Sequence, residues 1–261
     1  MSKADRNRQR AREKIAQARA LEAKRRRRRL TLSVAGAVVV VAAAATGIAL
    51  AVSGSHGGKT GGPSTPKLNL APLSTLGTLK PAPSPGPPGF EGVPVPQGAA
   101  ALATTATKTT GQAVDGIHCQ TNEQTIFHIH AHLTVFVNGA PRLIPAGIGI
   151  PGAVVQNTAQ GPAVGSGTCF YWLHTHAGDG IIHIESPIHR VYTLGNFFDE
   201  WGQPLGPNQV GPATGHVTAL YNGEVYKGNP RDIPLNAHAQ IQLEVGTPLI
   251  APVLITWPSG I

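Results

Sequence analysis

The chain has 261 residues and a formal net charge of +8, but this charge is unevenly distributed. Residues 1–29 hold 13 of the 21 Lys and Arg residues and three acidic ones, so eight basic and ten acidic residues remain for the rest of the chain. A nucleic-acid-binding domain carries its basic residues within the fold, and this distribution therefore argues against nucleic acid as a partner.

An uncharged apolar segment, residues 30–52, follows the basic tail. Its 23 residues are enough to cross roughly 30 Å of hydrocarbon as a transmembrane helix. Arg25–Arg29 directly before it predict an N-terminus in the cytoplasm. We therefore expect a single-pass cell-membrane protein with an extracytoplasmic C-terminal domain. The tail, residues 1–29, is suited to contact anionic lipid headgroups, or serves only as a topology signal. A cleaved signal peptide ending near Ala49-Leu50-Ala51 is the alternative.

The next segment, residues 53–113, contains ten prolines, many small residues and a single aromatic residue, Phe90. Such a composition buries too little apolar surface to offset the entropy of ordering the chain. We predict a disordered, semi-extended linker here. The remaining residues, 114–261, have a common single-domain length.

Histidines alternate with apolar residues in the predicted strand 126–137. Side chains of a strand point alternately to its two faces, so one face is expected to join the core. The other face presents His128, His130 and His132 together. The strand is followed by Asn138-Gly139, a residue pair typical of a two-residue hairpin turn.

A second histidine set lies around a predicted hairpin centred on Gly178-Asp179. A symmetric turn pairs His174 with His183 and makes His176 a diagonal neighbour. The two sets predict a metal site, in which Glu185 and Asp179 are an extra ligand, an orienting partner of an imidazole, or a general base. The predicted ligands are His128, His130, His132, His174, His176 and His183.

The two cysteines, Cys119 and Cys169, lie in the part expected outside the cytoplasm, where disulfides persist. A bridge between them would bring the two histidine segments together. A redox-active or metal-binding thiol pair is the alternative interpretation.

The C-terminal half predicts short strands, a hairpin at Asn222-Gly223 and one short helix capped by Thr193. The expected strands are 181–186, 189–193, 216–221 and 239–245, and the expected helix is 195–201. The runs TLGNFFDEWG, VTALYNGEVY and IPLNAHAQIQLEVG resemble the helix and closing strands of a β-grasp, ubiquitin-like fold. The predicted fold class is thus mainly β (α+β). The chain lacks the terminal Gly-Gly of sulfur carriers, so that function is not implied.

Three motifs, HxHxHLTVFVNG, HTHxxDGIIHIE and TLGxFFDxWG, resemble those of an uncharacterised family of exported, membrane-anchored bacterial and archaeal proteins. The resemblance covers about residues 118–246 and implies a shared domain design, but it brings no activity with it.

Imidazole ligands without thiolate or thioether favour Zn(II) or Cu(II). The first hypothesis is therefore a non-enzymatic, membrane-anchored protein that binds one of these metals outside the cytoplasm. The second is a zinc-dependent hydrolase or hydratase with three histidine ligands, in which Glu185 accepts the proton. The third is a cell-surface interaction or pH-sensing module in which the histidines bind no metal.

Overall fold

The computed structural model describes residues 68–105 and 110–261. These residues belong to one compact unit that begins at Thr65. The predicted basic tail, the apolar span 30–52 and the first part of the predicted linker lie outside them. Among the described residues, no helix is both long enough and apolar enough to cross a membrane.

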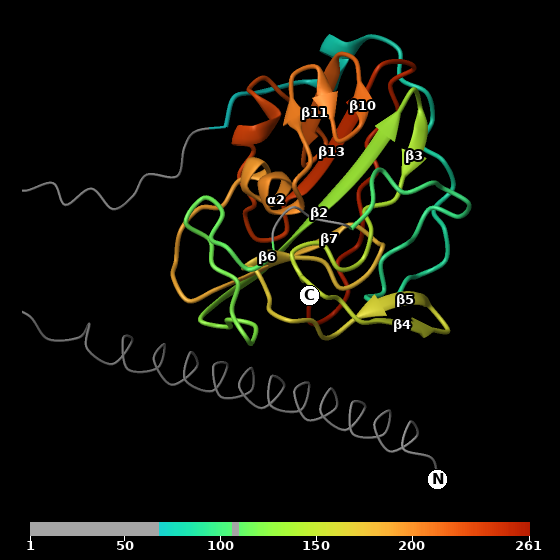
Figure 1. Ribbon diagram of the computed structural model, residues 1–261. Coiled ribbons are helices and arrows are strands. Elements are labelled where there is room, and N and C mark those ends of the chain that lie inside the picture. The colour runs from blue at the N-terminus through green and yellow to red at the C-terminus, as the bar shows by residue number, and fades with distance from the viewer. Residues whose placement is uncertain (1–67, 106–109) are drawn as a thin grey trace, which may run out of the picture. The chain divides into compact units, whose positions relative to one another are not determined.

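The described part is mainly β, as predicted, and a mixed eight-stranded sheet forms its centre (Figure 1). The longest strand, β2 (Phe127–Val137), pairs in parallel with β13 (Gln240–Val245) and antiparallel with β7 (Ile181–Ser186). The strand order is β1-β12-β11-β13-β2-β7-β6, and β3 also pairs with β2. The other strands of this sheet are β1 (Leu70–Ala71), β3 (Ala140–Arg142), β6 (Leu173–His174), β11 (Val217–Tyr221) and β12 (Glu224–Tyr226).

Smaller elements surround this sheet. One two-stranded and one three-stranded sheet are described, together with two 3-10 helices. They are β4 (Val155–Thr158) with β5 (Gly161–Val164), β8 (Leu205–Gly206) with β9 (Gln209–Val210) and β10 (Ala213–Thr214), and the 3-10 helices η1 (Leu73–Leu76) and η2 (Pro230–Asp232).

The side chains of β2 point alternately to the hydrophobic core and to the face that carries the histidines, as the sequence predicted. Ala131, Leu133 and Val135 are buried in the main hydrophobic core. The histidines occupy the intervening positions and therefore the other face of the sheet. The core side of the sheet thus fixes which way the histidine side chains point.

The helix α2 (Leu194–Trp201) begins one residue before the predicted start. Thr193 caps it as expected, because its hydroxyl accepts a hydrogen bond from the Asn196 backbone N–H. Gly202 ends the helix in the left-handed conformation, with φ of 71°. The helix contributes Phe197, Phe198 and Trp201 to the main hydrophobic core.

Both predicted hairpin turns are confirmed. Asn138-Gly139 joins β2 to β3, and Asn222-Gly223 joins β11 to β12. All four residues have positive φ, the condition that a type I′ turn imposes.

The predicted strand 189–193 was wrong. Of these five residues only Thr193 forms a bridge, an isolated one to Pro234. The chain bends after Ser186, whose hydroxyl donates to the Ile188 carbonyl. Ile188 and Val191 are each 49% exposed, so their apolar character does not mark a buried strand face.

The prediction of a disordered linker at residues 53–113 is also wrong in the part that the structure describes. Residues 68–105 lie against the domain instead of extending away from it. Leu70–Ala71 pairs with β12, and Lys80 and Ala101 form bridges to Ile250 and Leu143. Val93 and Leu102 are buried. A proline-rich segment cannot build a core of its own. Its scattered apolar residues are instead buried against a domain that already has a core.

The predicted disulfide between Cys119 and Cys169 is present, with the two Cα atoms 5.4 Å apart. Next to it, Gln120 pairs with Phe170 by backbone hydrogen bonds. The bridge thus ties the segment before β2 to the segment before β6. It closes a loop with a sequence separation of 50 residues.

Replacing both cysteines by serine in the full-length chain is expected to lower the free energy of unfolding by about 4 kcal/mol, through the extra entropy of the unfolded chain. Urea denaturation of wild type and double variant under non-reducing conditions measures this difference. A loss below about 1 kcal/mol would contradict the prediction.

Candidate metal centre

Three adjacent strands place histidines directly opposite one another. His130 on β2 pairs with His183 on β7, and His183 pairs in turn with His174 on β6. The predicted pairing of His174 with His183 is therefore confirmed. Opposed residues point to the same face of a sheet, so the three imidazoles form a row across it.

One group of donor atoms gathers at the β2 side of this row. His128 Nε2 lies 3.1 Å from His130 Nε2, which lies 3.1 Å from His183 Nδ1. Glu185 Oε1 lies 3.1 Å from His128 Nε2 and 3.5 Å from His183 Nδ1. Four ligands placed tetrahedrally around an ion at about 2.0–2.1 Å are themselves roughly 3.3 Å apart. The distances between neighbouring donors are close to this value, and the three imidazoles form a group that could hold a metal ion.

A second group lies at the β6 side. His174 Nδ1 donates to the Tyr171 carbonyl at 2.8 Å, and His176 Nδ1 donates to the Val164 carbonyl at 2.7 Å. These bonds place the ring proton on Nδ1 and leave a lone pair on each Nε2. The two Nε2 atoms face each other at 3.1 Å. Such backbone contacts to the far nitrogen are typical of metal-binding histidines.

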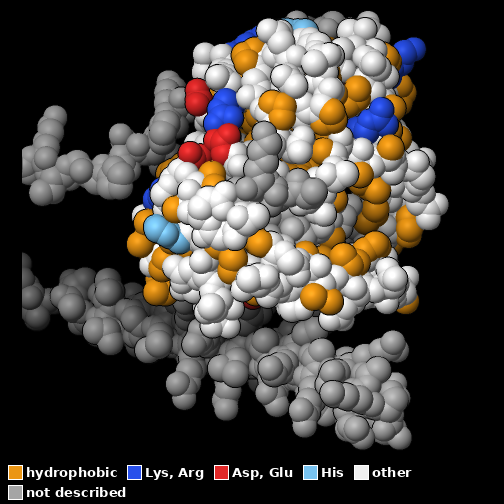
Figure 2. Space-filling view, viewed as in Figure 1, with side chains coloured by type: hydrophobic (Ala, Val, Ile, Leu, Met, Phe, Trp, Pro, Cys, Tyr) orange, Lys and Arg blue, Asp and Glu red, His pale blue; other side chains and the backbone are white. Residues whose placement is uncertain are grey.

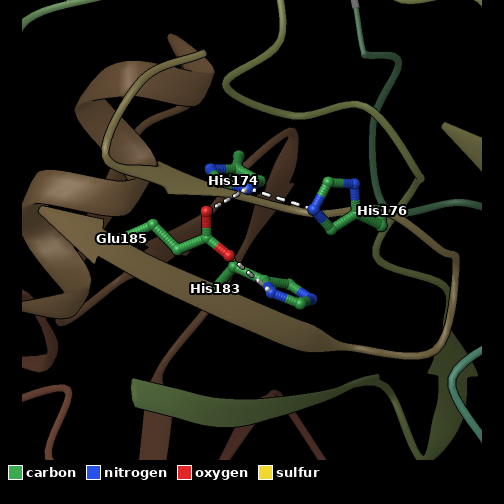
Figure 3. Close-up of side chains that lie close together, drawn as sticks. All are labelled: His174, His176, His183 and Glu185. Atoms are coloured by element: carbon green, nitrogen blue, oxygen red, sulfur yellow. Dashed lines mark hydrogen bonds and ion pairs between the residues drawn. The ribbon is translucent and has the colours of Figure 1, made fainter. Parts of the chain in front are cut away.

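Glu185 faces members of both groups, and Figure 3 shows its carboxylate between His174 and His183. Its Oε1 atom contacts His128 and His183, whereas Oε2 lies 4.0 Å from His174 Nε2. The residue is 4% exposed, and Oε2 has no hydrogen-bond partner in the described part of the chain. A buried carboxylate oxygen without a donor is costly unless a cation compensates it.

His183 lies between two carboxylates. Its Nε2 atom donates to Glu91 Oε1 at 2.6 Å, while its Nδ1 atom faces Glu185. Burial opposes protonation of His183, but Glu91 and Glu185 outweigh it and raise its pKa to about 10. Burial would raise the pKa of Glu185, yet contacts with His128 and His183 hold it well below its usual range.

His130, His174 and His176 are neutral at pH 7. Burial, followed by the charge of His183, lowers the pKa of His130 to about 2. Burial lowers the pKa of His174 to about 3, although Glu185 partly opposes this shift. Burial and the charge of His183 also lower the pKa of His176. Neutral imidazole is the form that binds a metal ion.

His132 takes a different place from the one predicted. It belongs to neither donor group of the described residues. Its Nε2 atom donates to the backbone carbonyl of Asp179 at 2.9 Å, and the ring is buried. Asp179 itself accepts a hydrogen bond from the Ile181 backbone N–H, and burial followed by the charge of Glu91 raises its pKa to about 7. His132 and Asp179 thus stabilise the turn that precedes β7.

Sequence reasoning missed two carboxylates at the site. Glu91 is buried against His183, and Glu123 Oε1 lies 3.5 Å from His176 Nε2. Glu91 is the single acidic residue between positions 53 and 113, a signal within the predicted linker that could have singled it out. Glu123 precedes β2 in a polar segment and carries no comparable signal.

On the face shown in Figure 2, Lys and Arg side chains are scattered and form no continuous basic patch. The histidine and carboxylate donors form two groups that could hold a metal ion. The chain matches no protein-family model, no curated protein and no solved structure in the comparisons.

Proposed function

We propose that this protein is a non-enzymatic, membrane-anchored protein that binds Zn(II) or Cu(II) outside the cytoplasm. The metal part of the proposal is carried by His174 and His176, whose Nε2 lone pairs face each other at 3.1 Å. Two lone pairs at this distance repel unless a proton or a cation lies between them. Because the pKa of both residues is lowered, a metal cation is the better partner near neutral pH.

The donor types restrict the metal. The two groups consist of imidazole nitrogens and the Glu185 carboxylate, and the two cysteines are joined in a disulfide. This set suits Zn(II) and Cu(II), and it lacks the soft sulfur ligands that select Cu(I).

Binding without catalysis is favoured over a hydrolase by the position of Glu185. A general base must be free to take a proton from the attacking water. Glu185 lies among the imidazoles at ligand spacing, and the low pKa of its carboxylate makes it a weak base. We therefore assign Glu185 as a ligand.

The fold and location complete the proposal. The β-grasp resemblance is supported by the central parallel pair β2–β13 and by α2, which lies in the chain between β7 and β11. The membrane anchor rests on the uncharged residues 30–52 and on Arg25–Arg29 before them. Protease added outside intact cells distinguishes the two orientations: an extracytoplasmic C-terminal domain is cleaved, whereas a cytoplasmic one is protected.

Metal content tests the function directly. Full-length protein, purified in detergent, stripped with chelator and reconstituted with Zn(II) or Cu(II), is expected to retain at least about one equivalent after desalting. His174→Ala should weaken retention by about tenfold or more, since it removes a ligand. His216→Ala, a change at an exposed histidine outside both groups, is the matched control. Less than a tenth of an equivalent in the wild type would refute metal binding.

A further inference from the structure

The two donor groups share His183, but together they extend too far for one ion to bind all of their members. The first group contains His128, His130 and His183, and the second contains His174, His176, His183 and Glu185. Ligands of one ion at about 2.1 Å lie at most roughly 4.2 Å apart. The pair His128 and His130 and the pair His174 and His176 do not fall into one common group even at 4.8 Å.

Glu185 presents one oxygen to each pair. Oε1 lies beside two members of the first group, at 3.1 Å from His128 Nε2 and 3.5 Å from His183 Nδ1. Oε2 is buried, lacks a hydrogen-bond partner among the described residues and lies on the side of His174. Figure 3 shows the carboxylate between the imidazoles of His174 and His183. A carboxylate in this position is suited to bridge two cations.

The remaining contacts assign the other ligands. Glu91 holds His183 by its Nε2 atom, so the Nδ1 atom of His183 faces the first group. A metal ion bound at Nδ1 displaces the proton that this nitrogen carries in the metal-free protein. Glu123 Oε1, at 3.5 Å from His176 Nε2, supplies a further oxygen to the second group. The carboxylates of Glu91, Glu123 and Glu185 together place three negative charges around the two positions. Two divalent cations are thereby largely compensated.

We propose that the domain binds a pair of divalent metal ions bridged by the Glu185 carboxylate, one held by His128, His130 and His183 and the other by His174, His176 and Glu123. This inference rests on the proposed metal-binding function and specifies its nuclearity. Ions bridged in this way lie about 4 Å apart.

Copper(II) alone is the probe for the first test. Full-length protein in detergent, stripped of metal and titrated with Cu(II), is expected to bind two equivalents. Electron paramagnetic resonance at two equivalents should show coupled ions, seen as a loss of the isolated Cu(II) signal and a half-field transition. Two equivalents with uncoupled spectra would overturn the bridge. One equivalent at saturation would overturn the pair while leaving the metal-binding function intact, and no bound copper would overturn both.

Variants then separate the two positions. His128→Ala and His176→Ala should each reduce the stoichiometry from two to one and leave an isolated Cu(II) signal. Glu185→Gln keeps the size of the side chain but removes the bridging charge, and it should abolish the coupling. His216→Ala is the control and should change neither result. If His128→Ala and His176→Ala both abolish all binding, the two groups hold one shared ion and the proposal fails. Because the wild-type spectrum is decisive by itself, a variant that fails to fold does not remove the test.

Discussion

Replacing His183 by alanine is expected to destabilise the metal-free protein by about 3–5 kcal/mol, because it leaves buried carboxylates without their cation. Glu91 Oε1 lies 2.6 Å from His183 Nε2, and Glu185 Oε1 lies 3.5 Å from His183 Nδ1. The side chains of both glutamates are less than 10% exposed. Urea denaturation of the chelator-treated full-length chain at pH 7 measures the loss, with His216→Ala as the control.

The free energy of unfolding that His183 contributes depends on pH. The folded-state pKa of His183 is raised to about 10, above its unfolded value of 6.5. Its contribution is therefore complete below pH 6.5 and is lost as the pH rises towards 10. The difference between wild type and His183→Ala should accordingly shrink between pH 7 and pH 10.

A second substitution separates charge from packing. Adding Glu91→Gln to His183→Ala removes one of the two uncompensated charges and should restore part of the lost stability. A loss below about 1 kcal/mol for His183→Ala, or no recovery in the double variant, would show that the ion pair is not the cause.

Acid is expected to unfold the metal-free domain through its buried neutral histidines. Burial lowers the pKa of His132 to about 4, from 6.5 in the unfolded chain. The unfolded chain binds more protons in this window, so stability falls as the pH drops from 6.5 to 4. His132 alone contributes about 3 kcal/mol to this loss.

His132→Gln tests this contribution. Glutamine does not titrate. Its amide N–H takes the place of the His132 Nε2–H group, which donates to the Asp179 carbonyl. The variant should lose about 3 kcal/mol less than wild type between pH 6.5 and pH 4, measured by urea denaturation with chelator present. Equal acid sensitivity of the two proteins would assign the loss to other groups, of which His130 and His174 are the first.

The strands and the register of the site follow from local pattern. Alternation in 126–137 predicts that one face of β2 enters the core, and this decides the direction of His128 and His130. The turn after His176 predicts that His174 faces His183, and the observed pairing agrees. These features depend on residues close together in sequence, where the two-residue period of a strand is sufficient.

Prediction failed where a contact depends on segments without periodicity. Glu91 reaches His183 from a proline-rich segment whose composition indicated a spacer. Residues 189–193 were predicted to form a strand, yet Val191 is half exposed and only Thr193 forms a bridge. In both segments the neighbouring domain decides the conformation, since their own sequence favours no regular element.

The sequence by itself thus predicted that histidines line one face of a β-sheet and that Cys119 and Cys169 form a disulfide, and both features are present. Only the tertiary structure decided how the donors divide. In that structure His132 donates to the Asp179 carbonyl and His183 donates to Glu91. The two oxygens of Glu185 face different histidine pairs. The physical reason is that strand periodicity fixes which face a side chain occupies, whereas packing between distant segments fixes the atom that each ring or carboxylate presents.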